Sequence, residues 1–126
     1  MFYDTSAFVD YLRGVPTVES YFEQVGSSSE GAYCSVITET ELWAGIRTDL
    51  DQLRVTEVLS RFNIVPVTSN VARLAGSLLR SVGDKKAHFG DALIAATAML
   101  ARETVLTADR RSENVFGSQS DYLVYR

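Results

Sequence analysis

Four acidic residues of the 126-residue sequence stand where a carboxylate could do chemistry. Asp4 and Asp109 each follow a short apolar stretch that is typical of a buried strand, and Glu41 and Asp91 each lie in the first turn of a predicted helix. Carboxylates that converge in a partly buried place repel one another unless a cation neutralises them. Mg²⁺ and Mn²⁺ prefer such a shell of oxygen ligands. The four acids therefore predict a divalent-metal site.

Asp91 is followed by a small and apolar run, Ala92 to Ala98, which predicts a helix that is buried on most of its faces. An ionised carboxylate beside a buried helix is costly unless it is paired. On this stretch alone, the more frequent role of such an aspartate is to cap the helix N-terminus, where negative charge is favoured. Capping and metal binding do not exclude each other.

Each of the other three acids also has an ordinary structural alternative. Thr38-x-x-Glu41 matches a capping box, in which Glu41 would bind only a backbone N–H. Asp4 and Asp109 could each be a turn residue after a strand. These roles explain the acids one at a time, but they do not explain why all four gather at one edge of a sheet.

The elements that must position these acids alternate between strand and helix. We predict strands at residues 1–3, 32–37, 63–67, 104–107 and 122–125, and helices at 7–13, 16–26, 39–46, 50–61, 69–82 and 91–102. Thr5 or Ser6 is expected to cap the first helix and Thr38 the third. Pro66 removes a ladder donor, which places its strand at or near a sheet edge. The pattern predicts an α/β fold in a single domain, residues 1–126, with a mainly parallel sheet whose ligands bind at the carboxyl ends of its strands.

Composition limits the function classes. The net charge of −4 argues against a simple basic-patch nucleic-acid binder, but not against an enzyme whose metal ions supply local positive charge. No apolar run approaches the roughly 18 residues of a membrane span and no signal peptide precedes Asp4, so we expect a cytoplasmic protein without membrane contact. The single cysteine, Cys34, is expected to be a small buried side chain in a reducing compartment. Ser27-Ser28-Ser29 is expected to form one loop.

The residues around the acids form four blocks that resemble a known family. The blocks are Asp4-Thr5-Ser6-Ala7, Ser35-Val36-Ile37-Thr38-x-Thr40-Glu41-Leu42-x-x-Gly45, Asp91-Ala92-Leu93-Ile94-Ala95-Ala96-Thr97-Ala98 and Leu106-Thr107-x-Asp109. In order and separation they resemble the signature blocks of PIN-domain ribonucleases, and more narrowly those of the VapC-type toxins of toxin–antitoxin pairs. Each block alone is a weak motif, but together they are specific.

The resemblance implies a metal-dependent endoribonuclease, with a five-stranded parallel sheet flanked by helices on both faces, that inhibits translation or growth as a toxin. Asp4, Glu41, Asp91 and Asp109 become its acidic quartet and the ligands of Mg²⁺ or Mn²⁺, with Asp4 and Asp91 the most direct. Thr5 and Thr107 fall on neighbouring hydroxyl positions, where they orient a carboxylate or bind a substrate phosphate. A cognate antitoxin, whose tail blocks the active site, and a homodimer are also implied.

The last block departs from the family pattern. Many relatives carry an acid–Phe pair about three residues beyond the Asp109 position, where this chain has Ser112-Glu113 and the phenylalanine, Phe116, comes later. Glu113 is therefore a second candidate for the fourth acid.

Basic residues border the predicted site. Arg110 and Arg111 follow the fourth acid, and Lys85 and Lys86 precede the helix of the third. They are candidates for contacts with RNA phosphates, and the alternative is that they are ordinary solvated charges. His88, the only histidine, is expected to belong to loop structure, because an oxygen-ligand site needs no imidazole.

Two other function classes remain open. Phosphoryl-transfer enzymes of the receiver or aspartate-phosphatase type also place acids at this edge of a sheet, but they need a Lys near the later strand ends, and none follows Thr107. A catalytically silent PIN-like module that binds RNA or protein would have no use for an intact acidic quartet. Metal-dependent cleavage of RNA that EDTA abolishes distinguishes the nuclease from both.

Overall fold

The computed structural model describes residues 1–26 and 30–126, and the loop expected at Ser27-Ser28-Ser29 lies outside them. The strands are β1 (Phe2–Tyr3), β2 (Tyr33–Ser35), β3 (Asn63–Val65), β4 (Val105–Thr107) and β5 (Tyr122–Val124). The helices are α1 (Thr5–Leu12), α2 (Pro16–Glu23), α3 (Val36–Ala44), α4 (Asp49–Leu59), α5 (Ser69–Leu79), α6 (Phe89–Ala101) and α7 (Arg110–Phe116). No helix in the described ranges is long and apolar enough to cross a membrane.

The five strands of the described chain form one parallel sheet in the order β3-β2-β1-β4-β5. The chain builds outward from β1 to β3 and then crosses to β4 on the other side of β1. The carboxyl ends of β1 and β4 therefore lie where the strand order reverses, which is where open parallel sheets bind ligands. β3 is at an edge of the sheet, as Pro66 directly after it predicts.

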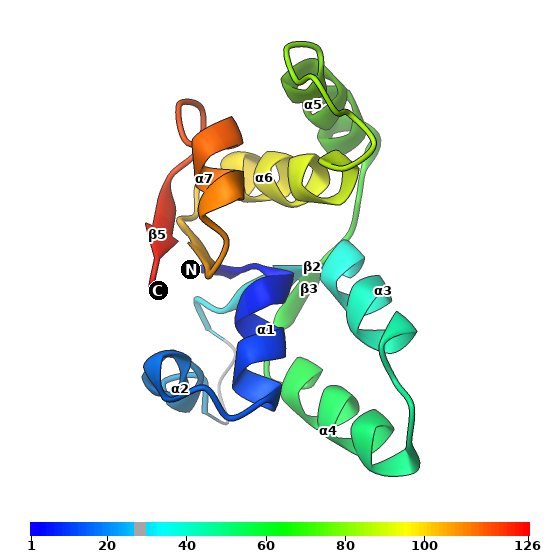
Figure 1. Cartoon of the computed structure of the whole chain (residues 1–126), viewed down its shortest axis with the longest axis vertical. Coiled ribbons are helices and arrows are strands. Elements are labelled where there is room, and N and C mark those ends of the chain that lie inside the picture. Colours follow the sequence, from blue (N-terminus) through cyan, green and yellow to red (C-terminus); the bar gives the residue numbers. More distant parts are fainter. Residues whose placement is uncertain (27–29) are drawn as a thin grey trace.

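Helices cover both faces of the sheet (Figure 1). α5, α6 and α7 lie on one face, α1, α2 and α4 on the other, and α3 contacts both layers through α1, α4 and α6. Neighbouring strand residues alternate between the two sides. Phe2 and Val105 pack with Ile94 of α6, whereas Tyr3 and Leu106 belong to the core beneath α1 and α2. The predicted α/β fold, with a parallel five-stranded sheet and helices on both faces, is confirmed.

α6 is buried along most of its length, as its composition predicts. Four of its alanines have no exposed surface: Ala92, Ala95, Ala96 and Ala98. Such small side chains let a helix approach its neighbours closely. The helix begins at Phe89 with His88 at the N-cap, so Asp91 is its third residue and the capping alternative for Asp91 is wrong. Asp91 still lies in the first turn, where the helix dipole favours negative charge.

The start of α3 differs from the prediction. Ser35 caps the helix, because its Oγ accepts a hydrogen bond from the backbone N–H of Ile37 at 3.0 Å. Val36 and Ile37 were expected to end a strand, since β-branched residues favour strands, but this cap makes them helical. The expected cap Thr38 is buried inside α3, so the capping-box role of Glu41 is wrong and Glu41 lies in the middle of the helix.

The sequence patterns do not predict α7. Asp109 caps this short helix by accepting a hydrogen bond from the backbone N–H of Arg111 at 2.9 Å. Its buried residues are Ser112 and Phe116, one turn apart, and this apolar pattern is too short to indicate a helix. α7 packs on α6 beside the carboxyl edge of the sheet.

Candidate active site

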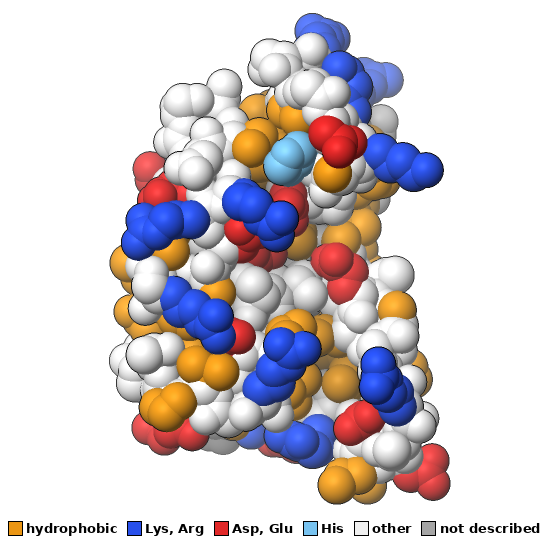
Figure 2. Space-filling view, viewed as in Figure 1, with side chains coloured by type: hydrophobic (Ala, Val, Ile, Leu, Met, Phe, Trp, Pro, Cys, Tyr) orange, Lys and Arg blue, Asp and Glu red, His pale blue; other side chains and the backbone are white. Residues whose placement is uncertain are grey.

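Four acidic side chains from four parts of the chain meet at the carboxyl edge of the sheet. Asp4 follows β1, Asp109 follows β4, Asp91 lies at the start of α6, and Glu41 lies in α3. Figure 2 shows acidic side chains gathered at the middle of this face, with Lys and Arg side chains around them. The other three acids are close enough for their charges to raise the pKa of Asp91. The structure thus brings the predicted quartet together.

Asp4 is buried, with 5% of its surface exposed. Its Oδ1 accepts a hydrogen bond from the backbone N–H of Thr5 at 2.8 Å, and its Oδ2 accepts from the hydroxyls of Thr107 at 2.7 Å and Ser6 at 3.1 Å. Asp4 is therefore the N-cap of α1, where Thr5 or Ser6 was expected, because the helix follows β1 with no turn between them. All three donors to Asp4 are neutral.

Burial raises the pKa of Asp4 above its ordinary value, and the charge of Glu41 adds to this rise. The hydrogen bonds to Asp4 act in the opposite direction, since they stabilise the ionised form. Of the ion pairs that the described residues form, none involves Asp4. Buried negative charge without a protein cation beside it is the kind of site that a metal ion stabilises.

A chain of hydroxyl groups holds Glu41. Thr5 Oγ1 donates a hydrogen bond to Glu41 Oε1 at 2.8 Å and lies 2.8 Å from Thr38 Oγ1. The Thr5 hydroxyl has one proton, which it donates in the hydrogen bond to Glu41. In the second hydrogen bond, Thr38 must therefore be the donor and Thr5 the acceptor. Because Thr38 has no exposed surface, this chain fixes one oxygen of Glu41 from the core outward. Thr5 and Thr107 were expected near a carboxylate or a phosphate. The hydroxyls of both donate hydrogen bonds to carboxylates.

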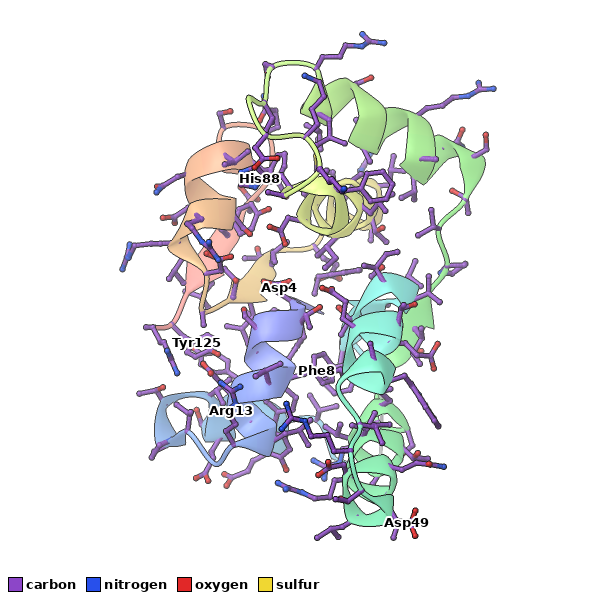
Figure 3. The ribbon with its side chains drawn as sticks, turned by 45° about the vertical axis from the view of Figure 1, so that its right-hand side comes forward. Asp4, Phe8, Arg13, Asp49, His88 and Tyr125 are labelled. Atoms are coloured by element: carbon purple, nitrogen blue, oxygen red, sulfur yellow. The ribbon has the colours of Figure 1, made fainter. Side chains whose placement is uncertain are left out.

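Asp91 is partly exposed, and its pKa is raised from 3.8 to about 6. Burial is the main cause, followed by the charges of the other three acids. The hydroxyl of Ser112 acts against this rise as a weak hydrogen-bond donor toward Asp91, and it has no hydrogen bond of full geometry with any described group. His88 Nδ1 is 3.9 Å from Asp91 Oδ2, which is beyond hydrogen-bond distance. Figure 3 shows Asp4 at the top of α1 and His88 above it at the start of α6.

Asp109 faces the site from the cap position of α7. Its Oδ1 accepts hydrogen bonds from the backbone N–H of Arg111 at 2.9 Å and from Arg111 Nε at 3.2 Å. Its own N–H donates to Thr107 Oγ1 at 2.9 Å. Thr107 therefore links Asp109 to Asp4, because the same hydroxyl donates to Asp4.

Glu113, the second candidate for the fourth acid, lies further along α7. Its Oε1 is 3.8 Å from Arg110 Nη1. Asp109 is among the charges that raise the pKa of Asp91, and Glu113 is not. The structure thus places Asp109, rather than Glu113, with the other acids.

The basic residues predicted near the site are on the surface. Arg110 and Arg111 begin α7, with 67% and 85% of their side chains exposed. Lys85 and Lys86 are exposed in the loop before α6, and Lys85 Nζ donates to the carbonyl oxygen of Val82 at 3.1 Å. The two arginines are the nearer pair, since Arg111 contacts an acid of the site directly.

Four residues beside the acids have no predicted role in the site: Ser6, Thr38, Ser112 and Tyr122. Ser6 and Thr38 stand in the sequence blocks of the first two acids, and that position was the available signal for them. Tyr122 is close enough to three of the acids that their charges, together with its burial, raise its pKa. Ser112 stands where many relatives carry the acid of the acid–Phe pair, and that position was the available signal for it. Tyr122 carries no sequence signal, because it reaches the site only through the packing of β5.

A groove with a volume of about 380 Å³ runs between α1, α3 and α4 and includes Glu41. Its lining mixes apolar side chains with charged ones, Arg13 and Arg54 among them. Gly45, one turn after Glu41 on α3, also lines the groove. The acidic site is thus continuous with a surface that suits a partly apolar ligand.

The donor set fits Mg²⁺ or Mn²⁺, because every side-chain donor in it is an oxygen. In the described part of the chain, no three His, Cys, Asp or Glu side chains stand close enough together to hold a metal by themselves. Mg²⁺ does not need three, since it usually binds through one or two carboxylates and keeps several waters. The negative charge that raises the pKa of Asp91 also fits a cation at this place.

Comparison with known proteins agrees with the geometry. The sequence pattern of the PIN domain family matches residues 1–116, which include all four acids. The chain is 31% identical to ribonuclease VapC19 of Mycobacterium tuberculosis over 117 residues, covering 90% of this chain and 91% of that protein. It is 33% identical to ribonuclease VapC10 of the same organism over 100 residues, covering 75% and 71%.

Solved structures share the fold over nearly the whole chain. A toxin–antitoxin complex from Klebsiella pneumoniae superposes with a TM-score of 0.75 at 22% identity, covering 99% of this chain and 97% of that one. VapBC2 from Rickettsia felis, bound to a DNA fragment from the promoter, gives 0.76 at 20% identity, covering 98% of each chain. FitAcB from Neisseria gonorrhoeae gives 0.70 at 27% identity, covering 97% and 95%.

Proposed function

This chain belongs to the PIN domain family, and from that premise we propose that it is a divalent-metal-dependent endoribonuclease, the VapC-type toxin of a toxin–antitoxin pair. The observation that carries the proposal is the concentration of negative charge at the carboxyl edge of the sheet, where burial and three neighbouring acids raise the pKa of Asp91 to about 6. The ribonuclease names of two relatives support RNA as the substrate class.

Asp4 and Asp91 are the residues that we expect to hold Mg²⁺ or Mn²⁺ directly. Hydrogen bonds already orient both oxygens of Asp4, and the buried helix α6 carries Asp91 on a rigid element. We expect Glu41 and Asp109 to orient water molecules around the ion rather than to hold it directly. When bound, the ion lowers the pKa of a water and neutralises charge that develops on the phosphate.

The remaining residues orient the reacting groups. Thr5 fixes Oε1 of Glu41, which leaves Oε2 free to accept a hydrogen bond from the attacking water. Thr107 and Ser6 hold Asp4 in place from the side opposite Thr5. Arg111, whose side chain is 85% exposed beside the acids, is positioned to bind an RNA phosphate, and Arg110 next to it extends this contact.

An antitoxin is the protein partner that the relatives support, since the solved structures include toxin–antitoxin complexes. We place a segment of it in the groove that includes Glu41. The apolar side chains of its lining fit the apolar face of a helix, and Glu41 fits a basic side chain of the partner. We also propose a homodimer.

The cytoplasm is the compartment that we propose for this chain. Cys34 has no exposed surface, and burial raises the pKa of its thiol to about 12, so it remains an unreactive thiol in a reducing compartment.

Phosphoryl-transfer enzymes of the receiver or aspartate-phosphatase type fit the geometry less well. The two lysines of the sequence, Lys85 and Lys86, precede α6 rather than follow a late strand of the sheet. A PIN-like module that only binds RNA or protein, without catalysis, does not account for the negative charge gathered around Asp91.

Cleavage of a mixed RNA pool tests the proposal. The purified chain is incubated with Mg²⁺ or Mn²⁺, with and without EDTA, beside the variants Asp91→Asn and Asp49→Asn. Asp49→Asn is the matched control, because Asp49 is exposed at the start of α4, far from Asp4 (Figure 3). We expect metal-dependent cleavage by the wild type and the control, and none by Asp91→Asn.

Each of the other outcomes has a clear meaning. Cleavage by Asp91→Asn at the wild-type rate contradicts the assignment of the site. Acid-stable incorporation of phosphate into the protein indicates phosphoryl transfer instead. The absence of both activities in the wild type favours the binding module.

A further inference from the structure

Two of the three buried side-chain polar atoms that make no hydrogen bond in the described chain lie beside Asp91. The three are Ser112 Oγ, His88 Nδ1 and Ser120 Oγ. Buried polar groups in native proteins are almost always hydrogen-bonded, so an open one calls for an explanation such as an ion or a water. Ser112 and His88 both border the carboxylate of Asp91, whereas Ser120 lies in the turn before β5.

The packing of α7 places Ser112 against the start of α6. Phe116 lies one turn later on the same face of α7 and packs with the alanines of α6. Its ring also meets the ring of His88 edge-on, with centroids 6.3 Å apart. This face of α7 therefore lies over the first turn of α6, and Ser112, which is 3% exposed, is its member nearest to Asp109, the helix cap. The only polar contact of its hydroxyl among the described residues is the weak one with Asp91.

We propose that Ser112 is a positioning residue of the metal site. With the ion bound, its hydroxyl donates a hydrogen bond to one oxygen of Asp91, and the other oxygen of Asp91 faces the ion. Hydrogen bonds of this kind orient ligating carboxylates and strengthen metal binding. This inference rests on the proposed function.

Binding of Mn²⁺ alone, followed by its electron paramagnetic resonance signal, tests the inference on the full chain. The variants are Ser112→Ala and the matched control Ser120→Ala, which removes a hydroxyl that is also buried and open, with 7% of the residue exposed. We expect Ser112→Ala to bind Mn²⁺ at least about tenfold more weakly, and Ser120→Ala to bind it as the wild type does. Both metal-free variants should keep or raise the wild-type Tm, because each loses an unpaired buried hydroxyl.

A cleavage assay adds a second measurement. Excess Mn²⁺ should restore the kcat of Ser112→Ala, since the loss is one of metal affinity. The inference is overturned if Ser112→Ala binds Mn²⁺ like the wild type, or if both serine variants lose affinity equally.

Asp91→Asn separates this inference from the proposed function. If the wild type binds Mn²⁺ no better than Asp91→Asn, the proposed function fails, and this inference fails with it. If Asp91→Asn loses Mn²⁺ binding while Ser112→Ala keeps it, only the role of Ser112 is overturned.

Discussion

The two ends of α1 each bury an aspartate, and the surroundings of the two differ. Asp10, near the end of the helix, is 6% exposed. It accepts a hydrogen bond from Tyr125 Oη at 2.6 Å and one from the guanidinium of Arg126 at 2.9 Å. Asp4, at the start, is 5% exposed and accepts hydrogen bonds only from neutral groups of the described chain.

We interpret the difference as one between a structural carboxylate, Asp10, and a carboxylate for which we propose a function, Asp4. At Asp10, the guanidinium of Arg126 neutralises the buried carboxylate. At Asp4 the fold supplies hydroxyls and a backbone N–H that orient the oxygens but leave their charge uncompensated. A buried charge left in this state favours a cation from solution. The following variants test this contrast, from the largest expected effect to the smallest.

Asp4→Asn should have the largest effect, and on activity alone. We expect RNA cleavage to fall by more than about a hundredfold, since loss of a partner that merely orients a metal ligand already costs 10–100-fold. The metal-free variant should be about as stable as the wild type, because the loss of an uncompensated buried charge offsets the hydrogen bonds that Thr107 and Ser6 donate to Oδ2, and an acceptor for the N–H of Thr5 remains. Cleavage rates with Mg²⁺ and thermal unfolding without it measure the two effects. A marked fall in Tm would make Asp4 a structural residue like Asp10 and remove the contrast.

Asp10→Asn should show the opposite pattern. We expect the free energy of unfolding to fall by about 1–3 kcal/mol, because the variant weakens two charge-assisted hydrogen bonds. At temperatures where the variant is folded, its cleavage rate should match that of the wild type. Urea denaturation measures the first effect, with Arg126→Gln as a companion that removes the cation instead. Lost cleavage in a fully folded Asp10→Asn protein would show that this end of α1 serves the site as well.

The metal-free protein should lose stability as the pH rises through the range in which Asp91 ionises. Because its pKa is raised from 3.8 to about 6, the folded state holds this proton more tightly than the unfolded state does. As the pH rises from about 4 to about 6, the unfolded state releases its proton first, and the folded state becomes less favoured. Above about pH 6, the ionised Asp91 should cost about 1–2 kcal/mol after screening by solvent.

Comparison with Asp91→Asn isolates this effect. The variant should match the wild type in stability near pH 4, and its advantage should grow until about pH 7 in urea denaturation without metal. Addition of Mg²⁺ should stabilise the wild type and narrow the gap. A gap that does not change with pH would mean that ionisation of Asp91 is not what costs stability.

Thr5→Val should have the smallest effect. The change removes the hydroxyl that donates to Glu41 Oε1 and accepts from Thr38, with little change of side-chain volume. We expect kcat to fall about tenfold, as for other partners that orient a site carboxylate, and metal affinity to change little. Thr5→Ser, which keeps the hydroxyl, should recover most of the rate. Equal losses in both variants would assign the effect to packing rather than to the hydrogen bond.

The location of the acids could be predicted because each strand is short and apolar and ends at a polar residue. Asp4 and Asp109 sit at such ends, and the topology of parallel strands then places them together. The start of α3 could not be predicted, since Val36 and Ile37 favour a strand and only the cap at Ser35 makes them helical.

The contacts of Asp10 and of Ser112 were beyond prediction for a different reason. The partners of Asp10 are Tyr125 and Arg126, more than a hundred positions away along the chain, and no local pattern pairs them. Ser112 belongs to a helix whose buried face is two residues long. Contacts of this kind are set by how elements pack, which sequence patterns do not record.

The central place of β1 has a consequence for synthesis of the protein. Asp4 is the first of the four acids to leave the ribosome. Its N–H donates to the carbonyl oxygen of Leu106 at 2.9 Å, and its carboxylate accepts a hydrogen bond from Thr107, which is 103 positions later in the chain. A nascent chain that stops short of β4 therefore lacks both Asp109 and the strand that holds Asp4 in register. Domains fold as units once their sequence has emerged. The acidic site is thus incomplete until β4 and Asp109 have left the exit tunnel.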